Sequence, residues 1–240
     1  MKTRLDRLIV ERGLAQSREK AQALVMAGEV LLNGRKASKP GQSVAPDCVV
    51  EVLARPPYVS RGGFKLAGAL RHFAIDVAGK VCVDIGSSTG GFTDVLLQAG
   101  AARVHAVDVG AGQLAWALRT DPRVRVHEGI NARGLTLAEI GEHANFITCD
   151  VSFISVTLIL PAAVPLLHAD GQMVILIKPQ FEAGKGQVGK GGIVREPELH
   201  RAACEKITRA VRELGFETGI MESPILGTEG NKEFLLYARH

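Results

Sequence analysis

The stretch VCVDIGSSTGGFTDVLLQAG (Val81–Gly100) decides the fold class. It begins with a short strand core, VCVDIG, continues through a turn rich in glycine, and ends in a helix-like segment, TDVLLQAG. Glycine allows the backbone to turn tightly between the two elements and to approach a ligand closely. The stretch therefore predicts a strand, a ligand-binding turn and a helix in that order.

The same order is repeated downstream of Val81–Gly100. The segments VHAVDVG, RVRVHEG, NFITCDVS and QMVILIKP are typical of strands. Between them lie helix-like segments: QLAWALRT, TLAEIGEH and SVTLILPAAVPLLHAD, the last at residues 155–170. Such alternation predicts an α/β fold with a doubly wound, mostly parallel sheet. Ligands of these sheets bind beyond the carboxyl ends of the strands, so functional residues are expected there.

A small basic module precedes the sheet. Residues 1–55 hold ten Lys and Arg against six Asp and Glu, whereas residues 56–240 hold nineteen of each. The net charge of +4 therefore lies entirely in the first quarter of the chain, as expected for a domain that binds a polyanion. Two prolines in the following segment stiffen it and cannot continue a strand ladder. We expect a small α+β domain at 1–55, a linker at 56–60 and the α/β domain at 61–240.

The order of elements in the small module is specific. Ser17 can cap the second of two short helices, and Asn33-Gly34 is a strong hairpin signal between two strands. Through RLDRLIVERGLAQSREKAQALVMAGEVLLNG, residues 3–53 resemble the RNA-binding domain named after ribosomal small-subunit protein four. The resemblance implies that Arg and Lys side chains face RNA phosphates, and a small domain for protein contacts is the alternative. The candidate RNA-binding residues, three of them in the large domain, are Arg4, Arg7, Arg18, Lys20, Arg35, Lys36, Arg61, Lys185 and Lys190.

The glycine turn has the spacing DxGxxxGG, which differs from the GxGxxG of dinucleotide enzymes. Its leading acid, Asp84, would repel a pyrophosphate but suits the ammonium group of S-adenosyl-L-methionine. Asp108 ends the next strand, where an acid can accept hydrogen bonds from ribose hydroxyls. Together these features resemble the cofactor site of class I methyltransferases, and a nicotinamide-dependent dehydrogenase is the alternative. The candidate cofactor-binding residues are Asp84, Gly86, Ser87, Ser88, Thr89, Gly90, Gly91, Phe92, Asp108 and Val109.

Four further residues stand at or near strand ends. Asp150 and Lys178 follow two strands, Glu233 begins the last strand segment, and Lys65 lies in the helix before Val81. SRGGFKL, CDVSFIS, IKPQFEAGKGQVGKGGIVRE and GNKEFLLY resemble the TlyA family of ribosomal RNA 2′-O-methyltransferases, within the FtsJ-like group, over the whole chain. This resemblance implies a catalytic tetrad of Lys65, Asp150, Lys178 and Glu233. The chain lacks the terminal extensions of longer members, so we expect a cytidine of large-subunit rRNA as its target.

A ribose hydroxyl is a poor nucleophile, and positioning it can supply about 7–11 kcal/mol of the barrier in favourable cases. A lysine amine accepts its proton only when neutral, a form that burial and a neighbouring lysine both favour. Lys178 meets both conditions if Lys65 lies near it. Asp150 would orient Lys178, and Glu233 would hold Lys65. Lys178 could instead stay charged and only steer the hydroxyl.

Other signals are weaker. Gly184–Gly191 approaches a phosphate-binding loop but has glycine where Ser or Thr is required, so we interpret it as a loop near the site that touches RNA or is merely solvated. Trp116 and Leu118 are expected to pack in the core. Cysteine and histidine spacing predicts no metal, and the absence of 18 consecutive apolar residues predicts no membrane span. The four widely spaced cysteines are typical of free thiols in a reducing cytosol, so we expect a cytoplasmic protein. The remaining alternatives are a non-catalytic factor on ribosomal RNA or a ribosomal subunit, and a haemolysin, an old label of the family.

Overall fold

The computed structural model describes residues 2–53, 56–184, 188–189 and 191–240. Its contacts divide the chain into two compact units, residues 1–57 and residues 58–240, each with a hydrophobic core of its own. The Pro56-Pro57 pair falls at this division, which lies within two residues of the boundary expected between the small domain and the linker. The two units are described separately below.

In residues 2–53, the first unit contains two helices and two small sheets. Ser17 accepts a hydrogen bond from the backbone N–H of Lys20 and so caps α2 as expected. Asn33 and Gly34 both have positive φ, 47° and 77°, which is the backbone of a tight hairpin between β2 and β3. The elements are β1 (Thr3–Arg4), α1 (Leu5–Glu11), α2 (Arg18–Met26), β2 (Val30–Leu32), β3 (Arg35–Lys36), β4 (Ser43–Val44) and β5 (Val50–Val52).

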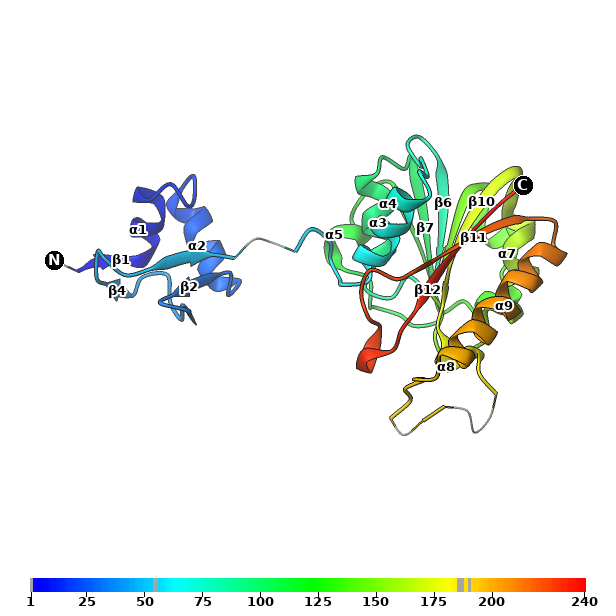
Figure 1. Cartoon of the computed structure of the whole chain (residues 1–240). Helices are drawn as coiled ribbons and strands as arrows, with labels where there is room; N and C mark the ends of the chain where they lie inside the picture. Colours follow the sequence, from blue (N-terminus) through cyan, green and yellow to red (C-terminus); the bar gives the residue numbers. More distant parts are fainter. Residues whose placement is uncertain (1, 54–55, 185–187, 190) are drawn as a thin grey trace. The chain divides into compact units, whose positions relative to one another are not determined.

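The second unit is built on one seven-stranded sheet, with strand order β11-β12-β10-β9-β6-β7-β8 (Figure 1). Strands β8, β7, β6, β9 and β10 run parallel, and β12 is antiparallel to both of its neighbours. The predicted doubly wound, mostly parallel sheet is therefore confirmed. Its strands are β6 (Val81–Ile85), β7 (Arg103–Asp108), β8 (Val124–Glu128), β9 (Ala144–Cys149), β10 (Leu167–Ile177), β11 (Glu217–Glu222) and β12 (Phe234–Arg239).

Helices cover both faces of this sheet (Figure 1). One core lies between the sheet and α3, α4 and α5, and the other lies between the sheet and α7 and α9. None of the helices in the described residues combines the length and hydrophobicity that crossing a membrane requires. The helices are α3 (Gly63–His72), α4 (Gly91–Gln98), α5 (Trp116–Arg119), η1 (Ala132–Gly134), α6 (Leu137–Ile140), η2 (Val156–Leu158), α7 (Leu160–Ala163), η3 (Val164–Leu166), α8 (Pro179–Glu182), α9 (Pro197–Glu213) and η4 (Thr228–Gly230).

Two local features differ from the sequence expectations. The segment 155–170, expected to be one helix, is divided into η2, α7 and η3, because Pro161 and Pro165 have no N–H group for a continuous helical ladder. Trp116 was expected in the core, but its side chain is 76% exposed at the start of α5. Leu118, from the same short helix, is buried as expected and lies under the glycine turn.

Candidate active site

Two lysine–carboxylate ion pairs lie at the carboxyl ends of the central strands. The amine of Lys178, directly after β10, is 2.6 Å from Oδ1 of Asp150, directly after β9. The amine of Lys65, from α3, is 2.5 Å from Oε2 of Glu233, directly before β12. All four residues come from different elements, and the sheet is what brings them to one edge.

The strand register places the two pairs side by side. β10 and β12 are paired up to Ile177 and Phe234, so Lys178 and Glu233 are the next residues on neighbouring strands. β9 is the other neighbour of β10 and ends just before Asp150. The expected convergence of the four residues at one rim of the sheet is therefore present in the structure.

Both pairs are largely removed from water. Lys65, Lys178 and Glu233 each expose about a tenth of their side chain or less, and Asp150 about a fifth. Among the described residues, Asp150 Oδ1 and Glu233 Oε2 have no hydrogen-bonding partner, and each oxygen faces a lysine amine in an ion pair. A buried ion pair is a weak stabiliser, because desolvating two charges offsets their attraction. Stability alone does not explain two such pairs at one sheet edge.

The glycine turn after β6 forms the wall of two neighbouring cavities. A cavity of about 470 Å³ is lined by Gly86 and Ser88 together with the ends of β7 and β9, and a smaller one of about 120 Å³ is lined by the turn itself. Both cavities reach Asp150. A Cβ atom at Gly86, where φ is +86°, would lie 2.4 Å from the carbonyl oxygen of Asp150, so only glycine allows this close approach.

Some cofactor candidates line the larger cavity, others line the smaller one, and Gly90 and Asp84 line neither. Asp108 and Val109 line the 470 Å³ cavity, and the Asp108 carboxylate accepts hydrogen bonds from the N–H groups of Ser88 (2.8 Å) and Gly110 (2.7 Å). A carboxylate has about four acceptor positions, so Asp108 retains capacity for a ligand hydroxyl. The smaller cavity is lined by six residues of the turn: Gly86, Ser87, Ser88, Thr89, Gly91 and Phe92. Gly90 does not line it and is the N-cap of α4, in the left-handed conformation.

Asp84 differs from the position expected for a cofactor contact. Its carboxylate is fully buried, lines neither cavity, and accepts hydrogen bonds from the hydroxyl groups of Thr93 (2.7 Å) and Thr148 (2.8 Å). Burial raises the pKa of Asp84 to about 6; the two hydroxyl groups oppose this shift and the charge on Asp150 adds slightly to it. Asp84 therefore ties β6 to α4 and β9 beneath the turn.

The loop after β9 contains residues that the sequence analysis did not identify. Ser152 Oγ accepts a hydrogen bond of 2.8 Å from the amine of Lys178. The next residue, Phe153, has φ of +65° and a side chain that is 91% exposed, at the mouth of the 470 Å³ cavity. Its ring centroid lies 5.1 Å from that of Phe181. Positive φ in a bulky residue is strained, and strain of this kind concentrates at functional sites.

The basic candidates are distributed over both units. In the first unit, Arg4 and Arg18 pair with the buried carboxylate of Asp6 at 2.9 and 3.3 Å, and the hydrogen bond from Arg4 holds the pKa of Asp6 well below its usual range. The Arg4 and Arg18 side chains remain half exposed, so Asp6 fixes their direction and leaves their outer N–H groups to solvent. The other candidates in this unit are Arg7, which pairs with Glu11, Lys20, which bonds Gln16, and the exposed Arg35 and Lys36 of β3.

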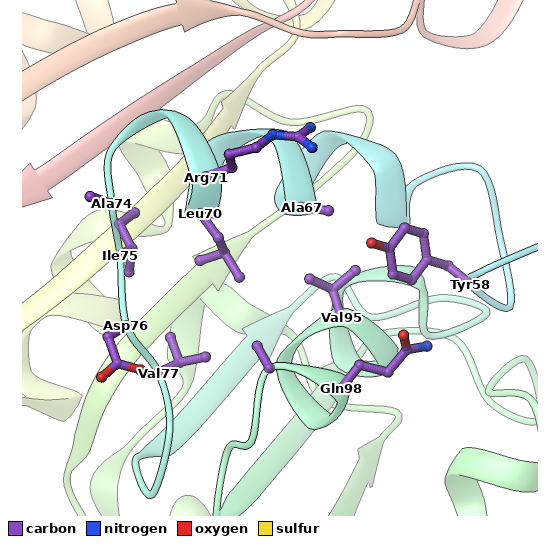
Figure 2. Close-up of a pocket in the computed structure, with 11 residues that line it drawn as sticks. Tyr58, Ala67, Leu70, Arg71, Ala74, Ile75, Asp76, Val77, Val95 and Gln98 are labelled. Carbon is purple, nitrogen blue, oxygen red and sulfur yellow. The ribbon is translucent and has the colours of Figure 1, made fainter.

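In the second unit, Arg61 lines a cavity of about 540 Å³ that also reaches the catalytic candidate Lys65. Lys185 and Lys190 lie outside the described residues. A further cavity of about 570 Å³ lies between α3, α4 and the segment 74–77 (Figure 2). Its lining includes Leu70 and Val95 and none of the four residues of the ion pairs. No group of three or more His, Cys, Asp or Glu residues in the described part of the chain is arranged to hold a metal ion.

The sheet, the glycine turn and the polar strand ends define a class I methyltransferase. The FtsJ-like methyltransferase profile matches residues 58–240 and the S4 domain profile matches residues 3–50. The 16S/23S rRNA (cytidine-2′-O)-methyltransferase TlyA of Mycobacterium tuberculosis is 48% identical to this chain over 241 aligned residues, which cover 99% of the chain and 90% of that protein. The chain belongs to the TlyA family of FtsJ-like methyltransferases and carries an S4 domain at its N-terminal side.

Two further relatives show how wide this similarity is. The 23S rRNA (cytidine-2′-O)-methyltransferase TlyA of Campylobacter jejuni is 36% identical, with 95% of this chain and 96% of that protein covered. A solved structure from Streptococcus thermophilus, described as a candidate hemolysin, is 45% identical and superimposes with a TM-score of 0.76 over 99% of this chain and 88% of that chain. The predicted resemblance to the TlyA family is confirmed.

Proposed function

We propose that this chain transfers a methyl group from S-adenosyl-L-methionine to the 2′-hydroxyl of a cytidine in large-subunit ribosomal RNA. The observation that carries the proposal is the pair of lysine–carboxylate contacts beside the cavity at the glycine turn. The names of the M. tuberculosis and C. jejuni relatives support the substrate, because 23S rRNA and cytidine occur in both. Only the name of the M. tuberculosis relative includes 16S rRNA, so the experiment also tests whether small-subunit RNA is methylated.

The cavity lining fits the proposed cofactor. Asp108 offers a carboxylate to the ribose hydroxyls, while Val109, Ile130 and Ile154 offer an apolar surface to the adenine ring. The smaller cavity brings the turn residues and Asp150 to the charged end of the ligand. When bound, S-adenosyl-L-methionine supplies an electrophilic methyl group on a positively charged sulfur. We propose the turn residues together with Asp108 and Val109 as its site, with Asp84 supporting the turn from below.

The chain's own residues handle the substrate hydroxyl. In the transfer, the bond from sulfur to the methyl carbon breaks, a bond from O2′ to that carbon forms, and the hydroxyl proton leaves. We assign the proton to the amine of Lys178, which Asp150 holds at 2.6 Å. Lys65, fixed by Glu233 at 2.5 Å, places a second amine at the same edge, where it can hold the oxygen. General-base assistance of this kind contributes about 10²–10⁴-fold in rate.

The basic residues supply the RNA contacts in this proposal. Phosphate contacts position a nucleic acid and make binding salt-dependent without reading its sequence. We assign this role to the exposed Arg and Lys side chains of the first unit and to Arg61, and we extend it to Lys185 and Lys190. An enzyme that acts on ribosomal RNA or on a ribosomal subunit works where ribosomes are, so we propose the cytoplasm as its location.

Two variants of the full chain test the proposal. With tritiated S-adenosyl-L-methionine and unmodified ribosomal subunits, Lys178→Ala and Lys65→Met should each reduce transfer by about 10²–10⁴-fold. Calorimetric affinity for S-adenosylhomocysteine should stay within about twofold, because neither lysine lines the cofactor cavities. Glu198→Gln, in an exposed ion pair on α9, is the matched control. Near-normal turnover of Lys178→Ala would refute the mechanism.

Assays on the same protein distinguish the proposed methyltransferase from the alternative functions. A non-catalytic RNA-binding factor would transfer no label to either subunit, and a nicotinamide-dependent enzyme would bind a nicotinamide cofactor in the calorimeter. A haemolysin would release dye from liposomes. Mapping 2′-O-methyl marks on ribosomal RNA of a deletion strain identifies the nucleotide and the subunit.

A further inference from the structure

The amine of Lys178 donates a hydrogen bond to a residue that the tetrad does not include. Ser152 Oγ lies 2.8 Å from Lys178 Nζ, and Asp150 Oδ1 lies 2.6 Å from the same atom. A neutral amine has two N–H donors and one lone pair, and a charged amine has three donors. The hydrogen bond to Ser152 fixes the direction of one N–H, and the ion pair with Asp150 holds the nitrogen in place, so the two contacts together restrict where its remaining positions point. Asp150 alone would leave the amine free to rotate.

The loop that presents Ser152 is held in a costly conformation. Phe153 has φ of +65°, and its side chain is 91% exposed, so burial of its own ring does not enforce that backbone. Conformations of this kind persist only when the surrounding structure determines them. The restraint must therefore come from residues on either side of Phe153.

Glu182 supplies this restraint. Its side chain is 3% exposed, and its carboxylate accepts hydrogen bonds from Ser155 Oγ (2.6 Å) and from the backbone N–H of Val156 (2.8 Å). Lys206 of α9 balances the buried charge at 2.8 Å and also donates to Ser155 Oγ. We call Ser155, Val156, Glu182 and Lys206 the loop clamp.

The loop clamp connects the two partners of the hydrogen bond. Glu182 is the last residue of α8, and Lys178 is the N-cap of that helix, so both belong to one rigid turn. The Glu182 carboxylate fastens this turn to the end of the loop that carries Ser152. The distance between the amine and the serine hydroxyl is thus determined by one buried carboxylate.

We propose that Ser152 is a positioning residue for the amine of Lys178, and that the loop clamp keeps Ser152 in place. The inference deepens the proposed function and rests on it, since the amine must act on the substrate hydroxyl for its direction to matter. Glu182 lines neither cavity at the glycine turn, whereas Ser152 lines the larger one and not the smaller one. Removal of Glu182 is therefore expected to affect the transfer step and not cofactor affinity. Removal of Ser152 is expected to affect the transfer step more than cofactor affinity, because its hydrogen bond goes to the amine of Lys178.

The first test is Ser152→Ala in the full chain, with Ser152→Thr as the conservative variant. Ser152 is exposed, so its removal should leave folding intact. Under saturating unmodified subunits, the single-turnover rate of methyl transfer should fall about tenfold in the alanine variant, the loss expected for a hydrogen bond to a charged group. KM for the subunit should change less than about twofold, Kd for S-adenosylhomocysteine should change less than the transfer rate, and threonine should restore most of the rate. A wild-type rate in Ser152→Ala would overturn the proposal.

The second test addresses the loop clamp. Glu182→Met with Lys206→Met removes the ion pair without leaving an unpaired buried charge, and it should also lower the transfer rate about tenfold. If the clamp acts through Ser152, adding Ser152→Ala to this double variant should cause no further loss. Full additivity would overturn the link, as would a wild-type rate in the clamp variant, with Glu198→Gln as the control on α9. Activity retained by Lys178→Ala would instead refute the proposed function, so the two failures are distinguishable.

Discussion

Replacing Asp84 by asparagine should change how the stability of the protein depends on pH. Asp84 is fully buried beneath the glycine turn, and burial raises its pKa from 3.8 to about 6. Well below pH 3.8 the group is protonated in both the folded and the unfolded state and has no effect on the pH dependence. From about pH 3 to pH 6 the unfolded chain releases this proton while the folded protein keeps it, so stability decreases as pH rises. Above pH 6 both states are ionised and the contribution is constant.

The size of the effect follows from the shift. Each pKa unit corresponds to about 1.36 kcal/mol, so a shift of about two units makes the wild-type protein about 3 kcal/mol less stable at pH 7 than well below pH 3.8 through this group, and about 2 kcal/mol of this loss falls between pH 4 and pH 7. The asparagine side chain of the variant cannot ionise, so the variant lacks this loss. Its hydrogen bonds to the two threonines are less favourable than those of Asp84, but that difference does not vary with pH.

The assay is urea unfolding of both proteins at several pH values between 4 and 7.5, followed by circular dichroism. The free energy of unfolding of Asp84→Asn minus that of the wild type should increase by about 2 kcal/mol from pH 4 to pH 7. Glu198→Gln, an exposed carboxylate on α9, should give a curve parallel to the wild type. Parallel curves for Asp84→Asn as well, or a difference that shrinks with rising pH, would refute the argument from burial.

Three further outcomes are expected. Gly86→Ala should weaken S-adenosylhomocysteine binding at least tenfold in calorimetry, because its Cβ would lie 2.4 Å from the Asp150 carbonyl oxygen and must displace that wall; unchanged affinity would contradict the close approach. Arg35→Ala with Lys36→Ala should weaken RNA binding and lower the slope of log K against log salt by about 2, whereas an unchanged slope would remove these residues from the interface. Gly34→Val should destabilise the first unit by about 1–2 kcal/mol in urea unfolding, since φ there is +77°; no loss would mean that the turn can relax.

Much of the site could be predicted because it depends on strand ends. In a parallel sheet the carboxyl ends of all strands meet at one edge, so Asp108, Asp150 and Lys178 could be placed together from periodicity alone. The same holds for the hairpin at Asn33-Gly34, where local backbone chemistry determines the structure. Such features can be predicted when a single segment of the sequence determines the local structure.

The remaining features depend on contacts between distant segments. Asp84 was expected to face the cofactor because it opens the glycine turn, but the hydroxyl groups of Thr93 and Thr148, which come from two other elements, hold it inside. The contact between Glu182 and Lys206 joins α8 to α9, and no spacing in the sequence indicates it. The exposure of Trp116 likewise depends on how the four-residue helix α5 packs on the rest of the domain, which its own sequence does not indicate.

The exposed Trp116 also makes the protein its own optical reporter. The chain contains a single tryptophan, and the residue before it, Ala115, donates a backbone hydrogen bond of 3.2 Å to the carbonyl of Thr89 in the glycine turn. The tryptophan fluorescence of this protein therefore comes from a single indole ring that lies next to the cofactor candidates. Ligand binding at the glycine turn can be followed in the unlabelled enzyme by the wavelength and intensity of this emission.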